Sequence, residues 1–167
     1  PRKGPFIVIA NHPIGAIDGL IMLKILLTYH PDSIVMANFL LKKIKPIADC
    51  ICAVNPFETR KDVFNSTSGL RQALTQLQNG LPLGIFPAGE VSARTHRFVG
   101  PIFDKPWDIS AIKIIKKAQV PVLPMYFHAR NSDLFYWMAD LHANLRTARL
   151  PSEVMKAKNK KIVVRIG

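Results

Sequence analysis

Cysteines are few in this sequence, and long apolar runs are missing. Only Cys50 and Cys52 occur among 167 residues, and two thiols without a disulfide framework suit a reducing compartment. We expect no bridge between these two cysteines. No apolar run approaches the roughly 20 residues of a membrane-spanning helix, and no signal peptide is visible. Any spanning or anchoring segment would lie outside this sequence, which we expect to be a piece of a longer protein.

Acidic side chains are also scarce. Lys and Arg number 23 against 11 Asp and Glu, which gives a formal net charge of +12. Such a charge favours an anionic membrane surface, an anionic substrate or nucleic acid as the partner. We rank the three in that order and expect no nucleic-acid partner, because aromatic residues make up only 8% and no nucleic-acid-binding motif is recognisable. The basic residues cluster at Lys42–Lys45, Arg94–Arg97, Arg146–Arg149 and Lys156–Lys161. The predicted location is the cytoplasm, peripheral to or anchored at the inner face of the membrane.

Strand-like apolar runs alternate with helical patterns along the chain. Strands are predicted at Ile7–Ala10, Ile34–Ala37, Ile51–Val54, Leu83–Phe86, Val120–Phe127 and Ile162–Ile166. Helices are predicted at Asp18–Tyr29, Phe39–Ile44, between residues 65–68 and Asn79-Gly80, at Ile109–Ala118 behind an Asp108 cap, at Leu134–His142, and in a short last segment capped by Ser152. The alternation predicts one α/β domain over residues 1–167, with a mixed, largely parallel sheet flanked by helices.

Two stretches depart from this regular pattern. Val120–Phe127 contains two prolines, which predicts an edge strand or one whose N–H groups are not needed at those positions. Pro87–Pro106 shows little structure of its own, and a loop of that length in a compact domain is usually functional or mobile.

The exit from the first strand carries the strongest chemical signal. The strand breaks into Asn11-His12-Pro13, and Asp18 follows just before the expected helix. Ligand crevices of open α/β sheets form where such loops leave the strands. A His with a carboxylate able to reach its other ring nitrogen has the parts of an oriented general base. The alternative is structural, because Asp18 is also a good helix N-cap.

Four stretches together resemble the four sequence blocks of the glycerolipid (lysophospholipid) acyltransferase family. They are Asn11-His12 with Asp18, Pro56–Arg60, Phe86–Ser92 and Val120–Pro124. The resemblance implies that His12 is the general base on the acceptor hydroxyl and that Asp18 orients it. It implies substrate-binding roles for Asn11, Arg60, Phe86, Pro87, Gly89, Glu90, Ser92 and Arg94. The acyl donor would be acyl-carrier protein or acyl-CoA as a co-substrate, with no bound cofactor, and the acceptor a lyso-lipid.

The chemistry agrees with that assignment. A hydroxyl is a poor nucleophile until a base takes its proton, and the developing oxyanion of a thioester needs hydrogen-bond donors, which the backbone around Gly89 could provide. No His with nearby carboxylates has the spacing of a zinc site, so we expect no metal.

The sequence also departs from the usual family pattern. Five residues rather than four separate His12 from Asp18, and Ala88 and Val91 stand where the third block usually has Glu and Arg. The missing arginine fork counts against a phosphate-bearing acceptor, although Arg94 or Arg97 could substitute.

These departures, with the tail that begins FHARNSDLFYWMADL, resemble a branch labelled hemolysin that includes lyso-ornithine-lipid O-acyltransferases. The implied function is O-acyl transfer to a lyso-aminolipid or a lysophospholipid. The alternative is a catalytically silent, basic membrane-binding domain that keeps the fold.

Overall fold

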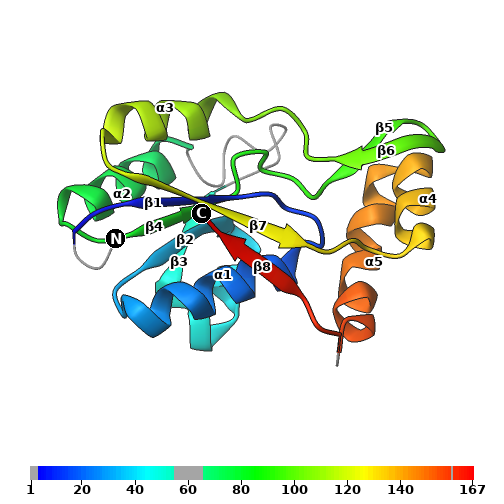
Figure 1. Cartoon of the computed structure of the whole chain (residues 1–167), viewed down its shortest axis with the longest axis horizontal. Helices are drawn as coiled ribbons and strands as arrows, with labels where there is room; N and C mark the ends of the chain where they lie inside the picture. Colours follow the sequence, from blue (N-terminus) through cyan, green and yellow to red (C-terminus); the bar gives the residue numbers. More distant parts are fainter. Residues whose placement is uncertain (1–3, 55–65, 159) are drawn as a thin grey trace.

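A six-stranded sheet runs through the middle of the molecule (Figure 1). The computed structural model of the chain describes residues 4–54, 66–158 and 160–167. The strands lie in the order β3-β2-β4-β1-β7-β8. Their bounds are β1 (Ile7–Ala10), β2 (Ile34–Asn38), β3 (Ile51–Val54), β4 (Leu83–Ile85), β7 (Val122–His128) and β8 (Val163–Ile166). All neighbours are parallel except β8, which is antiparallel to β7. The predicted single-domain α/β fold with a mixed, largely parallel sheet is confirmed.

Helices cover both faces of this sheet. On one face α1 (Ala16–Tyr29) contributes Met22 and Leu26 to a buried cluster with Val8 of β1. On the other face α2 (Ser66–Gln78) and α3 (Ile109–Ala118) pack against Ile7 of the same strand. Figure 1 shows α3 above the sheet and α1 below it. Successive strand residues point to opposite faces, and a fully buried Val or Ile stabilises the fold by about 1.5–3 kcal/mol, so the central strand anchors both layers.

The topological switch point of the sheet lies between β1 and β4. These strands are adjacent, with Ile7 opposite Leu83. The chain leaving β1 enters α1 on one face, whereas the chain leaving β4 reaches α3 on the opposite face. Open α/β sheets form their ligand crevice at such a point, beyond the carboxyl ends of the strands. The loop after β1 carries His12 and the loop after β4 begins with Phe86.

A hairpin occupies the stretch Pro87–Pro106, so the expectation of little structure there was wrong. Strands β5 (Ala93–His96) and β6 (Val99–Phe103) pair antiparallel, with His96 opposite Val99. Two-residue hairpin turns favour Asn-Gly or Gly in sequence, whereas this turn is Arg97-Phe98. The sequence therefore lacked the usual signal for the hairpin.

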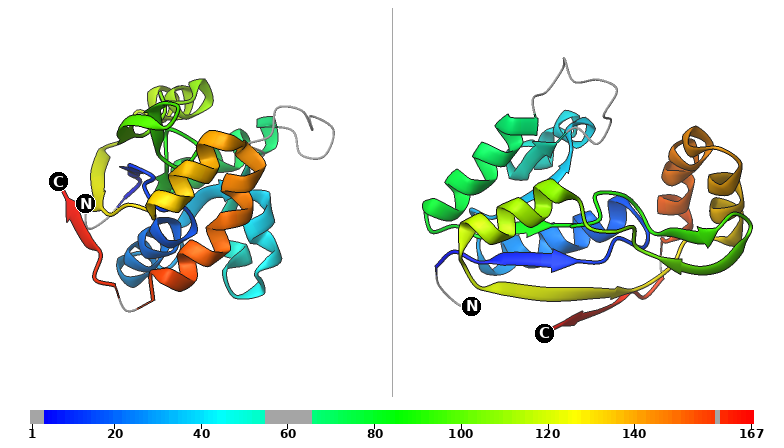
Figure 2. Two further views of the ribbon diagram at one scale, coloured as in Figure 1. Left: turned by 90° about the vertical axis from the view of Figure 1, so that its right-hand side faces the viewer. Right: turned by 90° about the horizontal axis from the view of Figure 1, so that it is seen from above.

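Helices α4 (Asp133–Leu141) and α5 (Ala143–Lys156) pack on each other. Figure 2 shows this pair beside the hairpin at one end of the molecule. The expected short helix capped by Ser152 was wrong, because α5 begins nine residues earlier and Pro151 lies inside it. An interior proline removes a helix hydrogen bond and usually ends the pattern; here the Ser152 hydroxyl donates to the Arg149 carbonyl at 2.8 Å.

The two prolines do not place β7 at an edge, because it lies between β1 and β8. Pro121 precedes the strand, and only Pro124 lies within it. The Pro124 carbonyl accepts from the Gly167 N–H at 3.0 Å. The N and C=O of one strand residue point to the same side, so the missing N–H faces β8, which has already ended at Ile166. Of the two expectations for this strand, the edge position is wrong, and the alternative, that no N–H is needed at the proline, agrees with the structure.

Smaller differences concern the segment before β3. The expected basic helix Phe39–Ile44 is a 3₁₀ helix, η1 (Phe39–Lys43), and a second one, η2 (Lys45–Cys50), follows it. Cys50 therefore ends η2 and only Cys52 lies in a strand; both are free thiols. Burial raises the pKa of the Cys52 thiol to about 11, which makes this thiol unreactive at neutral pH.

Among the described residues, none of the helices combines the length and the apolar character that crossing a membrane requires.

Candidate active site

His12 and Asp18 lie beside each other at the carboxyl end of β1. The distance from His12 Nδ1 to Asp18 Oδ1 is 3.1 Å, so the carboxylate reaches the ring nitrogen as the sequence predicted. The Nδ1 atom is buried, and its N–H direction is not aligned for a well-formed hydrogen bond. The Asp18 side chain is 0% exposed and that of His12 is 18% exposed. One ring edge therefore faces a buried carboxylate, while part of the ring stays open to solvent; the catalytic roles of both residues stay predictions.

Asp18 is held by the backbone of its own loop. Its Oδ2 accepts from the N–H groups of Ile14 at 2.9 Å and Gly15 at 3.3 Å, and its Oδ1 from Gly19 at 3.0 Å. Because α1 begins at Ala16, Asp18 lies in the first turn and is not the N-cap residue. Gly15 has φ +87°, and a Cβ there would come within 2.9 Å of Leu150. Glycine adopts such angles freely, so a glycine suits this turn between His12 and Asp18.

The main chain of His12 is clamped by the third block and by the hairpin. Its N–H donates to both oxygens of Asp104, at 3.0 and 3.2 Å, and its carbonyl accepts from the Ser92 N–H at 2.9 Å. The Ser92 hydroxyl also donates to Asp104. The imidazole ring lies 4.2 Å from the ring of Phe86, tilted by 32°. Asp104, which directly follows β6, was not predicted, because nothing local in the sequence distinguishes it from a solvated loop aspartate.

Asn11 links two strands through its side chain. Its amide donates to the Phe127 carbonyl at 3.1 Å and accepts from the Phe127 N–H at 2.7 Å. It thereby continues the pairing of β1 with β7 past the point where β1 ends. Nearby, the side chain of Asn131 donates to the Pro13 carbonyl at 3.2 Å. Both neighbours of His12 are thus fixed, Asn11 to β7 and Pro13 to the β7–α4 connection. The predicted substrate contact of Asn11 competes with this backbone role.

The loop after β4 forms a tight turn. The Gly89 N–H donates to the Phe86 carbonyl at 2.9 Å, and Gly89 has φ +68°. The Pro87 carbonyl accepts from the Asp108 N–H at 2.8 Å, which joins this turn to the start of α3. The Gly89 N–H is thus already used within the turn, and the expectation that backbone donors around Gly89 serve an oxyanion stays a prediction.

Glu90 and Arg94 hold separate parts of this end of the molecule together. Glu90 Oε2 accepts from Lys105 at 2.6 Å and from Arg146 of α5 at 2.9 Å. Burial raises the pKa of the Glu90 carboxyl, but the hydrogen bonds from Lys105 and Arg146 outweigh burial and hold the pKa below its ordinary value. Arg94 lies 3.3 Å from Asp140 of α4. Both residues were predicted as substrate contacts, and both have charged partners within the protein.

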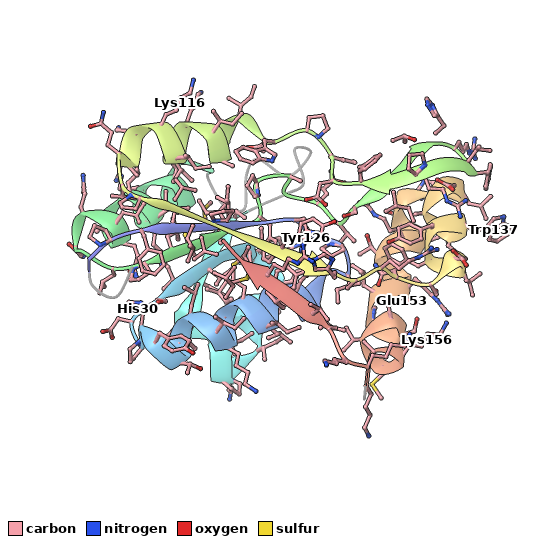
Figure 3. All side chains as sticks on the ribbon, in the orientation of Figure 1. His30, Lys116, Tyr126, Trp137, Glu153 and Lys156 are labelled. Carbon is pink, nitrogen blue, oxygen red and sulfur yellow. The ribbon has the colours of Figure 1, made fainter. Side chains whose placement is uncertain are left out.

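Another carboxylate, that of Glu153 in α5, fixes the start of α4 (Figure 3). It accepts from the Ser132 N–H at 2.9 Å and the Ser132 hydroxyl at 2.7 Å, and lies 3.4 Å from Arg149 and 3.7 Å from Lys156. Burial raises the pKa of Glu153, but the Ser132 hydrogen bonds and the two cations outweigh it, so the pKa lies below its ordinary value.

Val91 stands at the position where the family pattern has an arginine, and its side chain is buried. It packs with Phe135, Tyr136 and Leu150 in a small apolar cluster between the third block and the helices. A residue here faces the core and not a ligand. Arg60 and the rest of the second block, Pro56–Arg60, lie outside the described residues.

An open pocket of about 920 Å³ borders the His12 loop. It is lined by Asn11, Pro13, Ser92 and Asp104 around the His12 loop, by residues 98–103 of the hairpin, and by Tyr126 and Arg130. The His12 ring is not among the lining residues, although the residues on either side of it are. Within residues 4–54, 66–158 and 160–167, no three His, Cys, Asp or Glu side chains gather closely enough to hold a metal ion.

The chain belongs to the acyltransferase family, whose family model matches residues 2–167. It is similar to a lyso-glycine lipid O-acyltransferase of Bacteroides thetaiotaomicron, with 28% identity over 175 residues, and to one of Phocaeicola vulgatus, with 26% identity over 174 residues. Both similarities cover 100% of this chain but only 61% and 60% of the relatives. The chain thus spans about three fifths of the length of these curated relatives.

Proposed function

We propose that this protein is an O-acyltransferase that moves a fatty acyl group from a thioester to the hydroxyl of a lyso-lipid. The acceptor oxygen attacks the thioester carbonyl, a C–O ester bond forms, the C–S bond breaks, and the thiol leaves. His12 Nε2 takes the proton of the hydroxyl and returns it to the departing sulfur. The observation that carries this proposal is the buried Asp18 carboxylate 3.1 Å from His12 Nδ1, because a carboxylate there stabilises the imidazolium that forms during transfer.

The acceptor we propose is a lyso-lipid built on an amino acid. The names of the two relatives, lyso-glycine lipid O-acyltransferases, support this choice. The buried Val91 supports it too, because the position at which the family usually has an arginine cannot hold a phosphate here. A lyso-ornithine lipid and a lysophosphatidate are the competing acceptors.

The donor we propose is acyl-carrier protein or acyl-CoA, and the working surface is an anionic membrane. Lys42, Lys43 and Lys45 are exposed in η1 and η2, which follow β2 at the same edge of the sheet as His12. Each basic residue near an anionic surface contributes on the order of 1 kcal/mol at low ionic strength. Binding to anionic vesicles should therefore weaken with added salt, and equal binding to neutral vesicles would contradict this part of the proposal.

The test is a transfer assay with the full-length protein. Acyl-CoA and acyl-carrier protein are each offered with a lyso-glycine lipid, a lyso-ornithine lipid and lysophosphatidate, and products are identified by mass spectrometry. We expect ester formation on an amino-acid lipid to exceed that on lysophosphatidate. No product with any acceptor, together with intact vesicle binding, would favour the catalytically silent membrane-binding domain. Faster acylation of lysophosphatidate would overturn the acceptor assignment.

A further inference from the structure

Aromatic and aliphatic side chains rim the pocket and are exposed to solvent. The exposed fractions of the rim residues range from 40% to 70%. They are Phe98, Val99 and Phe103 of the hairpin, Trp107 after it, and Tyr126 of β7. We call these five residues the rim; Tyr126 is labelled in Figure 3. The surfaces of soluble proteins tolerate scattered apolar residues, but a contiguous set around one opening marks a site of interaction.

Polar contacts fix the tip of the hairpin in place. Phe98 has φ +63°, a left-handed backbone that a bulky residue adopts at some energetic cost. Its N–H donates to the Asp140 side chain at 3.0 Å and its carbonyl accepts from Arg94 at 3.0 Å. The Arg97 guanidinium lies 5.2 Å from the Phe98 ring centroid. The tip therefore presents Phe98 and Val99 outward in a defined arrangement.

The composition of the rim favours a lipid surface as its occupant. Trp, Tyr and Phe with interspersed Arg and Lys are typical of segments that sit at a membrane–water interface. The cations that line the pocket are matched by acids of the same chain, in the pairs Arg94–Asp140, Lys105–Glu90 and Arg130–Asp133. Attachment here would depend on apolar insertion more than on net charge, which favours a bilayer over an acidic protein.

The rim and the candidate site are continuous. The pocket that the rim residues line is also lined by Ser92 and Asp104, which hold the His12 main chain. We infer that the rim inserts into a lipid bilayer and that the pocket is the entrance through which a membrane lipid reaches His12. This inference rests on the proposed function for the identity of that lipid, but insertion of the rim can be measured without any turnover.

The native Trp107 provides a direct probe of insertion. The experiment uses a full-length variant in which Trp137 is replaced by Phe and Trp107 is the sole tryptophan. This variant is mixed with vesicles of phosphatidylglycerol and phosphatidylcholine whose acyl chains carry bromine. We expect a blue shift of the emission and quenching by bromine, at low and at high salt. Unchanged emission on vesicles that do bind the protein would overturn the proposal and indicate that another segment or a second copy covers the rim.

A pair of matched charge insertions localises the effect. Val99 is 70% exposed at the hairpin tip and Tyr29 is 75% exposed at the end of α1, which returns to the amino edge of the sheet. Val99→Asp should lower vesicle partition at least about tenfold, because an apolar contact is lost and a charge must be desolvated. Tyr29→Asp should stay within about twofold of wild type.

Thermal melts and gel filtration serve as the check that both variants are folded and unassociated. Wild-type partition of Val99→Asp, or an equal loss with Tyr29→Asp, would overturn the proposal. If the rim inserts but no acyl transfer is detected, the proposal about the rim stands and the proposed function is rejected.

Discussion

The sheet and the opposite end of the molecule are stabilised in different ways. In the sheet, apolar side chains of β1 are buried on both faces, with Val8 against α1 and Ile7 against α2 and α3. At the other end, among the residues that the structure describes, the hairpin and the α4–α5 pair share a small apolar cluster around Phe135 and Tyr136. Charged and polar contacts also join these elements, chiefly those of Glu90, Glu153 and Arg94.

This difference locates the candidate site at a boundary. His12 belongs to the sheet through β1, whereas Asp104 and Ser92 bring the hairpin and the third block onto its main chain. The apolar layers set the position of the base, and the polar end encloses the pocket beside it. Substitutions should separate the two contributions, because some remove activity directly and others loosen only the polar end.

The largest effect that follows from the comparison concerns Asp18. Asp18→Asn should lower kcat on the order of 100-fold, because an amide cannot stabilise the imidazolium. It should also lower the free energy of unfolding by about 1–3 kcal/mol, since the amide nitrogen must face either His12 or a backbone donor. Transfer kinetics and urea melts measure both, with the exposed Asp32→Asn as control; an unchanged kcat would refute the pairing.

An intermediate effect is expected at the boundary itself. Asp104→Ala frees the His12 N–H and the Ser92 hydroxyl, so we expect kcat to fall about tenfold with little change in KM, because a small misplacement of a reacting group is costly. Asp104→Asn keeps one acceptor for the N–H and should recover part of the loss. Asp49→Ala, at an exposed position, serves as control, and an equal loss there would show that the effect is not positional.

Glu153 tests the polar end without touching the site. Glu153→Gln should lower the free energy of unfolding by about 1–3 kcal/mol, because the partly buried Ser132 donors lose a charged acceptor. Thermal melts measure the change, and Asp133→Asn, 81% exposed on the same pair of helices, provides the control. Equal melting temperatures for wild type and Glu153→Gln would mean that apolar packing alone holds α4 and α5.

The smallest effect is that of Glu90, whose side chain is 37% exposed. Glu90→Gln should lower the free energy of unfolding by at most about 1 kcal/mol. The pKa values of Glu90 and Glu153 are both lowered from 4.5 in the folded state. Their stabilisation is therefore complete above pH 4.5 and is lost as the pH falls through the folded values. The stability difference between wild type and the Glu90→Gln/Glu153→Gln protein should close on acidification below pH 4.5; a difference independent of pH would contradict the assignment.

The sheet and the end formed by the hairpin, α4 and α5 also differ in how well the sequence predicts them. The sheet strands were predicted to within about two residues, because their apolar runs fix them locally. The hairpin and the full length of α5 were not, since Arg97-Phe98 is an unusual turn and Pro151 interrupts a helical pattern. The proximity of His12 to Asp18 was predicted from their shared loop. The role of Asp104 was not predictable, because its contact with His12 joins positions 92 residues apart.

The central claim is that His12 is the base of acyl transfer, and its removal is the most direct test. We would compare His12→Ala with His96→Ala, an exposed histidine of the hairpin, in full-length protein with a thioester donor and a lyso-glycine lipid. The account predicts a loss of at least about 100-fold in kcat for His12→Ala, with both variants folded and His96→Ala close to wild type. A His12→Ala protein that retains full acyl transfer would contradict it.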